Sequence, residues 1–400
     1  MCHIPTVPQP STSSTKRRNL LRGALGSIAI GLLPSMSFAL SSHSAIAPTL
    51  RRIKFAPNRA TASATDRAQW AAFRDRFITN EGRVIDTANG GVSHSEGQGY
   101  SMLLAEWAND RSSFERVFDW TRSHLSRPSD SLHGWCWDPH APLKMRDMNT
   151  ATDGELAIAW ALLRAAERWN VPEWRARALM MSRDILATSV QEANGRLFLL
   201  PGAFGFNKPD RLNLNPSYYN FPAIRALANA SDDPRWINID DNGLWLLEEA
   251  RFGKRGLSPD WVDVMKETAE VLPPSNGKLV FSWDAIRVPL FLAWAGENAA
   301  PALNAAAAFW TSKDGRWIPA WVNLRNGSLA PYEGHAGIVA VARLTLASVA
   351  LQSGAGVAVA DIPSQAEVPD YYAGALALLS RLAWQESRAT PHHPKPQMMS

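Results

Sequence analysis

Three carboxyl groups in this chain of 400 residues lie in polar turns that run into apolar segments. Glu96 lies in the run 94–101, two residues after a histidine and close to two glycines. A glycine there lets a substrate approach closely, because it has no Cβ. Asp153 and Asp284 lie in similar contexts farther along the chain. Carboxyl groups that act as an acid and a base can hydrolyse a bond between them, so these three residues are the first candidates for catalysis.

Each of these carboxyl groups also has an ordinary structural interpretation. Glu96 would favour the positive end of a helix dipole. Asp153, or Thr152 beside it, would cap the helix that follows. Asp284 is three residues before Arg287, and this spacing is typical of an ion pair at a helix end. The local context alone leaves both interpretations open for each residue.

Tryptophan is the compositional anomaly, with 17 residues in the chain. Indole rings at helical spacing among aliphatic residues are typical of a core. The residues of this kind are Trp107, Trp160, Trp169, Trp245 and Trp294. Indole rings in loops or at helix ends offer flat faces on which sugar rings stack. The residues of this second kind are Trp135, Trp137, Trp283, Trp317 and Trp321.

The elements that would position these residues are mostly helices. Apolar residues recur at three- and four-residue spacing in about twelve segments. These lie near 65–78, 97–108, 112–125, 153–169, 173–188, 216–229, 234–250, 260–270, 284–296, 301–311, 335–352 and 369–384. Two short strands are predicted, at 196–200 and 278–281. The pattern fits an all-α toroid of six inner and six outer helices, or a superhelical stack, although no repeat of fixed period supports the stack.

The two ends of the chain are predicted to lie outside the catalytic domain. Lys16, Arg17, Arg18 and Arg22 precede a weakly apolar run and then small residues, which is typical of an export signal and resembles the twin-arginine type. We expect residues 1–47 to be this signal, with cleavage after Ala47 or, alternatively, after Ala39. A single domain would then span 48–390, followed by a disordered tail at 391–400. The protein would be exported to the periplasm or secreted, with no membrane contact after cleavage.

The charge of the chain argues against a nucleic-acid-binding protein, and its cysteine content argues against a fold held by an intrachain disulfide. Removing residues 1–47 removes four of the 41 basic residues and no acidic ones, which leaves 37 of each. The mature chain is therefore formally neutral, and no nucleic-acid partner is expected. Of the two cysteines, Cys2 leaves with the signal, so Cys136 has no partner for a disulfide.

Four blocks of the sequence resemble glycoside hydrolase family 8, in the family order. They are 90–100, 149–169, 213–219 and 281–290. Within the family, the chain is most similar to the endoglucanases that accompany bacterial cellulose synthases. The resemblance implies an (α/α)6 barrel and hydrolysis of β-1,4-glucan with inversion. No metal or other cofactor is expected, because the histidines show no HExxH or comparable ligand spacing.

The resemblance also assigns roles to individual residues. It implies that Glu96 is the general acid, that Asp284 is the general base, and that Asp153 hydrogen-bonds the sugar in the cleavage subsite. The substrate-binding residues would be Trp135, Tyr218, Tyr219 and Arg287, although the two tyrosines could instead start a packed helix beside Pro216. One departure is visible, because Glu155 stands where the family usually has an aspartate.

Several alternatives share most of these features. The chain could hydrolyse another polysaccharide of the family, such as chitosan, xylan or mixed-linkage β-glucan. It could also be a glucan-binding accessory of a cellulose-export complex, in contact with a cellulose synthase. A metalloprotease-like hydrolase is disfavoured because the sequence has no HExxH spacing. A serine hydrolase is disfavoured because it has no Gly-x-Ser-x-Gly elbow.

Overall fold

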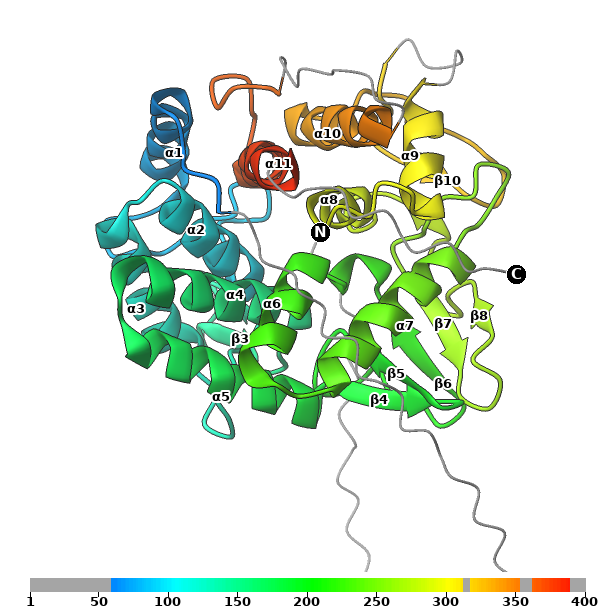
Figure 1. Ribbon diagram of the computed structural model, residues 1–400, viewed down its shortest axis with the longest axis horizontal. Helices are drawn as coiled ribbons and strands as arrows, with labels where there is room; N and C mark the ends of the chain where they lie inside the picture. The colour runs from blue at the N-terminus through cyan, green and yellow to red at the C-terminus, as the bar shows by residue number, and fades with distance from the viewer. Residues whose placement is uncertain (1–58, 312–316, 353–361, 389–400) are drawn as a thin grey trace, which may run out of the picture. The chain divides into compact units, whose positions relative to one another are not determined.

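The structure of the protein is a computed structural model that describes residues 59–311, 317–352 and 362–388, all within one compact unit (Figure 1). The predicted export signal at 1–47 and the predicted tail at 391–400 lie outside the described residues. These two segments, and the domain boundaries at 48 and 390, stay predictions.

The described residues contain eleven α-helices. They are α1 (Ala64–Phe77), α2 (Ser95–Trp107), α3 (Arg111–Leu125), α4 (Thr152–Trp169), α5 (Pro172–Thr188), α6 (Phe221–Ser231), α7 (Arg235–Glu249), α8 (Arg287–Trp294), α9 (Pro301–Thr311), α10 (Ala336–Gln352) and α11 (Tyr371–Arg388). A short 3-10 helix, η1 (Pro216–Tyr218), precedes α6. In the described part of the chain, no helix is both long and apolar enough to cross a membrane.

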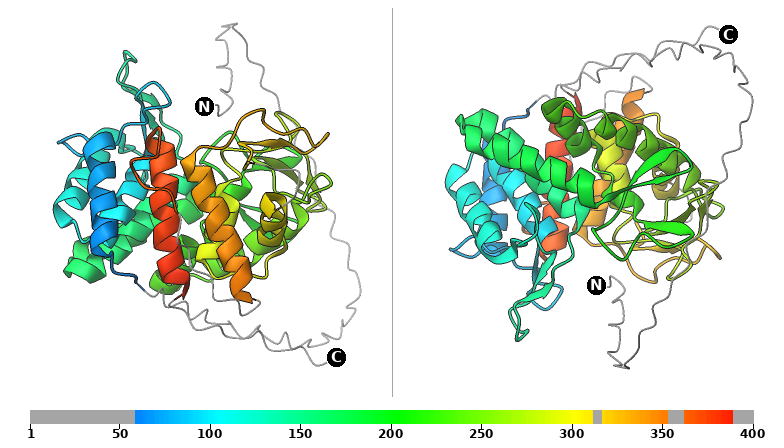
Figure 2. Two further views of the ribbon diagram at one scale, coloured as in Figure 1. Left: turned by 90° about the horizontal axis from the view of Figure 1, so that it is seen from above. Right: turned by 90° about the horizontal axis from the view of Figure 1, so that it is seen from below.

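Five of these helices form a closed ring. α2 packs on α4, α4 on α6, α6 on α8, α8 on α11, and α11 on α2. The other six helices lie outside and pack against members of the ring, and α1, α11 and α10 can be followed side by side in Figures 1 and 2. This is the predicted (α/α)6 barrel. Of the six inner and six outer helices that were expected, the described residues supply five inner and six outer ones.

Small residues let the first turns of α2 and α4 lie against each other. A Cβ added to Gly99 of α2 would lie 2.7 Å from the Cβ of Ala157 on α4. A Cβ added to Gly154 of α4 would lie 2.4 Å from the Oγ of Ser95 on α2. Both distances are shorter than van der Waals contact, so the two helices can approach this closely only with glycine at both positions.

The strands in the described residues form four small antiparallel sheets. They are β1 (Ser93–His94), β2 (Cys136–Trp137) and β3 (Met145–Asp147); β4 (Val190–Ala193) and β5 (Arg196–Leu199); β6 (Arg211–Leu214), β7 (Val262–Met265) and β8 (Val271–Leu272); and β9 (Val280–Phe281) and β10 (Val322–Asn323). The predicted strands at 196–200 and 278–281 correspond to β5 and β9. The β2–β3 hairpin projects from the helices in Figure 2.

The helix predicted at 260–270 is wrong. Residues 262–265 form β7, which pairs along its whole length with β6. Val262 and Val264 alternate with Asp263, and this two-residue period with β-branched side chains is typical of a strand. The short apolar run therefore had two interpretations, and pairing with a distant strand decided between them.

The predicted core tryptophans are mostly confirmed. Trp107, Trp160 and Trp294 are buried in the ring helices. Trp169 and Trp245 are half-buried, because α4 ends at Trp169 and Trp245 lies near the end of the outer helix α7.

Candidate active site

Arg287, the first residue of α8, lies among the three predicted carboxyl groups. It is buried, with 2% exposure. Nη1 contacts the Glu96 carboxyl group and donates to Asp153 Oδ2 at 2.9 Å. Nη2 donates to Asp284 Oδ1 at 3.1 Å. The structure thus brings together, around one guanidinium, the three carboxyl groups that the sequence singled out.

Glu96 is the second residue of α2, and the N-cap of that helix fixes its surroundings. The Nδ1 atom of His94 accepts the Gly97 N–H at 3.1 Å. A neutral His94 therefore carries its proton on Nε2, which lies 3.3 Å from Asp86 Oδ2. Glu96 Oε2 lies 3.7 Å from Nδ1, beyond hydrogen-bond distance. Its side chain is 15% exposed, and its Oε1 atom is buried.

Asp153 is the second residue of α4 and is almost completely enclosed, with a side-chain exposure of 5%. Burial is the main cause that raises the pKa of Asp153 to about 7. The Gly154 N–H, which donates to Oδ1 at 2.8 Å, opposes this shift, and the charge of Glu155 adds to it. Near neutral pH, Asp153 is therefore populated in both protonation states.

Asp284 lies in the turn between β9 and α8 and is the most open of the three carboxyl groups, with a side-chain exposure of 36%. Its Oδ2 accepts a hydrogen bond from Asn215 Nδ2 at 3.1 Å. Burial, followed by the charges of Asp260 and Asp153, raises the pKa of Asp284 to about 8. Because a third of the Asp284 side chain meets solvent, burial acts on it less than on Asp153, whose side chain is 5% exposed. The geometry best supports the part of the rise in the pKa of Asp284 that comes from the charges of Asp260 and Asp153.

The charge balance of this cluster favours a state in which one of the three carboxyl groups keeps its proton. Glu96, Asp153 and Asp284 face one guanidinium, and one positive charge cannot compensate three negative charges at close range. The cluster can therefore hold a protonated and an ionised carboxyl group at the same pH, which acid and base catalysis requires. Among the described residues, no group of three or more His, Cys, Asp or Glu side chains is arranged to hold a metal ion.

Besides Arg287 itself, two more of the predicted substrate-binding residues lie close to this cluster. The Trp135 carbonyl accepts the N–H of Ser95 at 3.1 Å, one residue before Glu96. The half-buried Trp135 indole is fixed by its Nε1, which donates to Asp147 Oδ2 at 2.9 Å. The ring centre of Tyr218 lies 5.5 Å from the Arg287 guanidinium carbon, within reach of a cation–π contact.

Tyr219, the neighbouring predicted residue, is not brought to the cluster. It is 1% exposed, and its hydroxyl accepts the N–H of Leu199 at 3.0 Å. A Cβ added to Gly243 of α7 would lie 2.3 Å from its ring, so the ring fills a tightly packed site. Tyr219 therefore has the packing role that the sequence analysis left open for it, and it is not a substrate-binding residue in this structure.

Sequence reasoning missed several polar groups around Arg287. Nη2 also donates to Ser217 Oγ at 3.0 Å, and Nη1 lies 3.4 Å from the Tyr100 hydroxyl. The Tyr371 hydroxyl packs on Gly97, where an added Cβ would lie 2.8 Å from it. Tyr100 and Ser217 lie inside blocks that had been recognised, so they could have been found there. Tyr371 begins the last described helix and carries no local signal of its role.

Glu155, the departure from the family pattern, is fully buried beneath the cluster. Oε1 accepts the His133 N–H at 2.7 Å and the Thr150 hydroxyl at 2.8 Å, and Oε2 lies 3.0 Å from His133 Nδ1. The longer side chain is thus satisfied by three polar contacts. It ties α4 to the segment that leads to Trp135.

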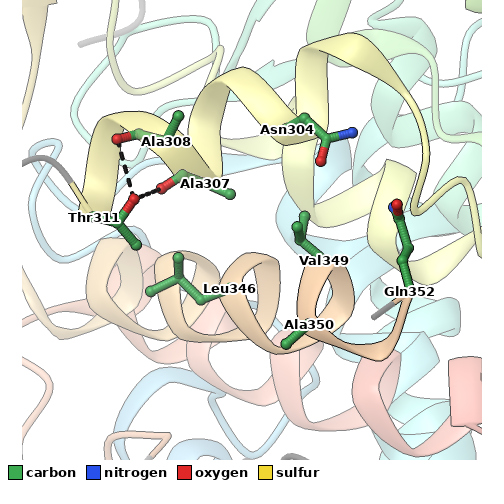
Figure 3. Close-up of a pocket in the computed structure, with 8 residues that line it drawn as sticks. All are labelled: Asn304, Ala307, Ala308, Thr311, Leu346, Val349, Ala350 and Gln352. Carbon is green, nitrogen blue, oxygen red and sulfur yellow. Dashed lines mark hydrogen bonds between the residues drawn. The ribbon is translucent and has the colours of Figure 1, made fainter. Parts of the chain in front are cut away.

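A hollow of about 640 Å³ lies between α9 and α10 (Figure 3), and no residue of the carboxyl cluster lines it. Its lining residues are Asn304, Ala307, Ala308, Thr311, Leu346, Val349, Ala350 and Gln352. The Thr311 hydroxyl bonds the carbonyls of its own helix. None of the described residues that line the hollow has a titratable side chain.

Comparisons with known proteins agree with the geometry. The sequence model of "Glycosyl hydrolases family 8" matches residues 42–386. A "Probable endoglucanase" of Novacetimonas hansenii is 40% identical over 319 residues, which cover 80% of this chain and 90% of the relative. An "Endoglucanase" of Cellulomonas uda is 40% identical over 278 residues, which cover 69% of this chain and 77% of the relative.

Solved structures show the same relationship. The endo-beta-1,4-glucanase CMCax from Acetobacter xylinum superposes with a TM-score of 0.75 at 37% identity, covering 81% of this chain and 99% of that structure. An endoglucanase from Komagataeibacter sucrofermentans superposes with a TM-score of 0.73 at 37% identity, covering 80% and 97%. The sequence match over residues 42–386 and the shared barrel of paired helices together show that the chain belongs to glycosyl hydrolases family 8.

Proposed function

We propose that this glycoside hydrolase is an endo-β-1,4-glucanase that cleaves cellulose-type β-1,4-glucan with inversion of configuration. The observation that carries the proposal is the convergence of Glu96 and Asp284 on two nitrogens of the Arg287 guanidinium. The substrate class follows from the relatives, which are named endoglucanases.

Inverting hydrolysis needs a protonated carboxyl group on one side of the glycosidic bond and an ionised one on the other. Glu96 gives its proton to the leaving oxygen as the bond from the anomeric carbon to that oxygen breaks. Asp284 takes a proton from water as the water oxygen bonds to the anomeric carbon from the opposite face. The proton that Glu96 loses and the proton that Asp284 gains are then exchanged with solvent, which resets both groups.

The difference in exposure supports this division of labour. The Asp284 side chain is 36% exposed and can meet water, whereas the Asp153 side chain is 5% exposed. Both oxygens of Asp284 are also oriented, one by Arg287 and one by Asn215. Asp153 is suited to hydrogen-bond the sugar in the cleavage subsite, where positive charge develops at the anomeric carbon.

Aromatic faces near the carboxyl groups would hold the neighbouring sugars. Trp135 lies one hydrogen bond from the start of α2, and Tyr218 lies over Arg287. Trp283, next to Asp284, is 40% exposed, and its ring stacks on His335 with centroids 5.1 Å apart. A rigid indole with one free face is a platform on which a glucose ring can stack.

Export to the periplasm or beyond and an association with a cellulose synthase are part of the proposal. Export is supported by the basic and apolar pattern within residues 1–47. The synthase association is supported by the likeness to endoglucanases that accompany such synthases. Co-purification with synthase subunits from the native cell envelope would test the second point.

The reaction is tested by measuring reducing ends released from carboxymethyl cellulose, chitosan, xylan and mixed-linkage β-glucan. We expect carboxymethyl cellulose to be cleaved and Glu96→Gln and Asp284→Asn each to lower kcat by about 10²- to 10⁴-fold without unfolding. Asp241→Asn, on the exposed face of α7, is the matched control and should retain full activity. The first product anomer, followed by NMR, should be α.

The same assays decide against the alternatives. Faster hydrolysis of chitosan or xylan would reassign the polysaccharide but keep the mechanism. Binding of glucan with no hydrolysis by the wild type would favour an accessory role. Normal turnover by Asp284→Asn would contradict the assignment of the base.

A further inference from the structure

Asp260 is a buried carboxyl group to which the proposed mechanism gives no role. It lies two residues before β7 and is 8% exposed. Its own N–H donates to the Val280 carbonyl at 2.8 Å, which ties it to β9. β9 leads directly into the turn that carries Asp284, so Asp260 lies beside that turn although the two residues are far apart in the chain.

The Asp260 carboxyl group binds the turn on both sides of Asp284. Oδ1 accepts the N–H of Ser282 and the N–H of Ala285, each at 2.9 Å. Oδ2 accepts the Ser282 hydroxyl. The first N–H groups of a segment that enters a helix have no helical partner. Here a carboxyl group from a distant segment supplies that partner.

We propose that Asp260 is a positioning residue that holds the Ser282–Ala285 turn and thereby directs the Asp284 carboxyl group at the attacking water. The inference rests on the proposed function, in which Asp284 is the base. Such a positioning residue matters because catalysis is sensitive to geometry: moving a catalytic group by about 1 Å can lower the rate about 100-fold. Arg287 and Asn215 orient the two oxygens of Asp284, and Asp260 fixes the backbone from which that side chain extends.

Asp260 also acts on the charge of Asp284. Burial contributes most to the raised pKa of Asp284, and the charge of Asp260 contributes next. The other charged or titratable groups around Asp284 are Arg287 on α8, Asp153 on α4, Tyr372 on α11, and Glu96 on α2, which shares Arg287. Removing the Asp260 charge while the others remain therefore lowers the pKa of Asp284 and makes it a weaker base.

The test compares Asp260→Asn, Ser282→Ala and wild type in the full chain on carboxymethyl cellulose. Asp260→Asn is expected to lower kcat by about 10- to 100-fold with little change in KM, because the backbone of the base moves and its charge environment changes. The acidic limb of the plot of kcat against pH should move to lower pH. Ser282→Ala keeps the charge of Asp260 and removes one hydrogen bond, so kcat should fall by about 2- to 10-fold with the limb unmoved.

Asp263→Asn is the matched control for loss of a buried carboxylate. Asp263 lies on β7, is 2% exposed, and accepts hydrogen bonds from Asn213 and from the Ser275 N–H, away from the turn that carries Asp284. It should leave both kcat and the acidic limb as in the wild type. If Asp260→Asn lowered the Tm but left the acidic limb in place, the role of Asp260 would be structural and the inference would be overturned. If Asp260→Asn did not fold, a wild-type kcat for Ser282→Ala would overturn it.

Asp284→Asn separates this inference from the proposed function. Loss of hydrolysis in Asp284→Asn, together with wild-type kcat and pH dependence in Asp260→Asn, would overturn the role of Asp260 alone. Full activity of Asp284→Asn would overturn the assignment of the base and, with it, the role of Asp260.

Discussion

At Asp153 the structure links the chemistry of one carboxyl group to the stability of the fold. Burial raises its pKa to about 7, whereas the pKa of an unfolded aspartate is about 3.9. The folded state therefore binds this proton more tightly. The stability that the proton contributes is fully present below about pH 4 and is lost as the pH rises through about 7. Asp284, with its pKa raised to about 8, acts in the same direction.

Asp153→Asn should reduce this pH dependence, because the amide has nearly the same size and does not titrate. We expect the Tm of the wild type to fall between pH 4 and pH 8, and the Tm of the variant to fall by at least about 2 °C less. Thermal unfolding followed by circular dichroism measures the difference. Asp241→Asn should follow the wild type. Parallel curves for the wild type and Asp153→Asn would show that the Asp153 proton is not held by the fold.

Individual site residues differ in how well the sequence could predict them. Glu96 and Asp153 lie in short motifs whose residues already indicate a catalytic role, and the structure places both at Arg287. Asp260 carries no local signal, because it acts on a turn 22 to 25 residues away. Tyr218 and Tyr219 are adjacent, yet one faces Arg287 and the other the core. Which of two neighbouring side chains faces a site depends on a backbone turn that composition does not reveal.

Among the elements, the α2–α4 crossing is the one on which the site depends most directly. Each helix carries a carboxyl group in its first turn, and the glycines at the crossing set the distance between them. Gly99→Ala would place a methyl group 2.7 Å from the Ala157 Cβ. The two helices would have to separate, and the carboxyl groups would move with them.

We expect Gly99→Ala to lower the free energy of unfolding by about 1–3 kcal/mol and to lower kcat by at least about tenfold. Urea unfolding and the carboxymethyl cellulose assay measure the two effects. Gly99→Ala combined with Ala157→Gly removes the shortest contact and should recover part of both losses, because the new Cβ would still lie 3.0 Å from the Ile158 nitrogen. No recovery in the double variant would mean that the close approach at Ala157 is not the cause.

Element types were easier to predict than their ends. Long amphipathic segments such as 153–169 and 173–188 are helices in the structure, because a 3.6-residue period sustained over four turns has no competing interpretation. In the segment 260–270 the two valines, Val262 and Val264, alternate with Asp263 at the two-residue period of a strand, and the segment pairs with β6 instead. A strand of four residues is stabilised by its partner, and the partner lies about 50 residues earlier in the chain.

Across the whole molecule, the ring helices carry a cluster of arginine and carboxyl groups at each end, and the two clusters differ in how far they are exposed. The first turns of α2, α4 and α8 carry Glu96, Asp153 and Arg287. The last turns of α2, α4 and α11 carry a buried ion network. Arg164 Nε donates to Glu106 Oε2 at 2.6 Å, and its Nη1 lies 2.8 Å from Glu386 Oε1. One end is partly open for chemistry, and the other is closed by charge pairs.

Arg164→Met should leave two buried carboxyl groups with less compensation and destabilise the protein by about 3–5 kcal/mol. Because the network lies at the far ends of the helices, kcat at 25 °C should stay within about twofold of the wild type. Urea unfolding and initial rates measure these effects. Arg175→Met, at an exposed position of α5, is the control and should change neither. A large loss of kcat in a folded Arg164→Met protein would mean that the two ends are coupled.

The position of α11 in the ring has a consequence for protein synthesis. Tyr371 packs on Gly97 of α2, and the Tyr372 hydroxyl donates to the Trp283 carbonyl at 2.6 Å, so the last described helix lies between the earliest and the latest parts of the site. A ribosome makes the segment of Glu96 roughly 275 residues before it makes this helix. The nascent chain therefore cannot close the ring around its reactive groups until α11 has been translated, and a product shortened before Tyr371 would have the acid and the base but no closed barrel to hold them.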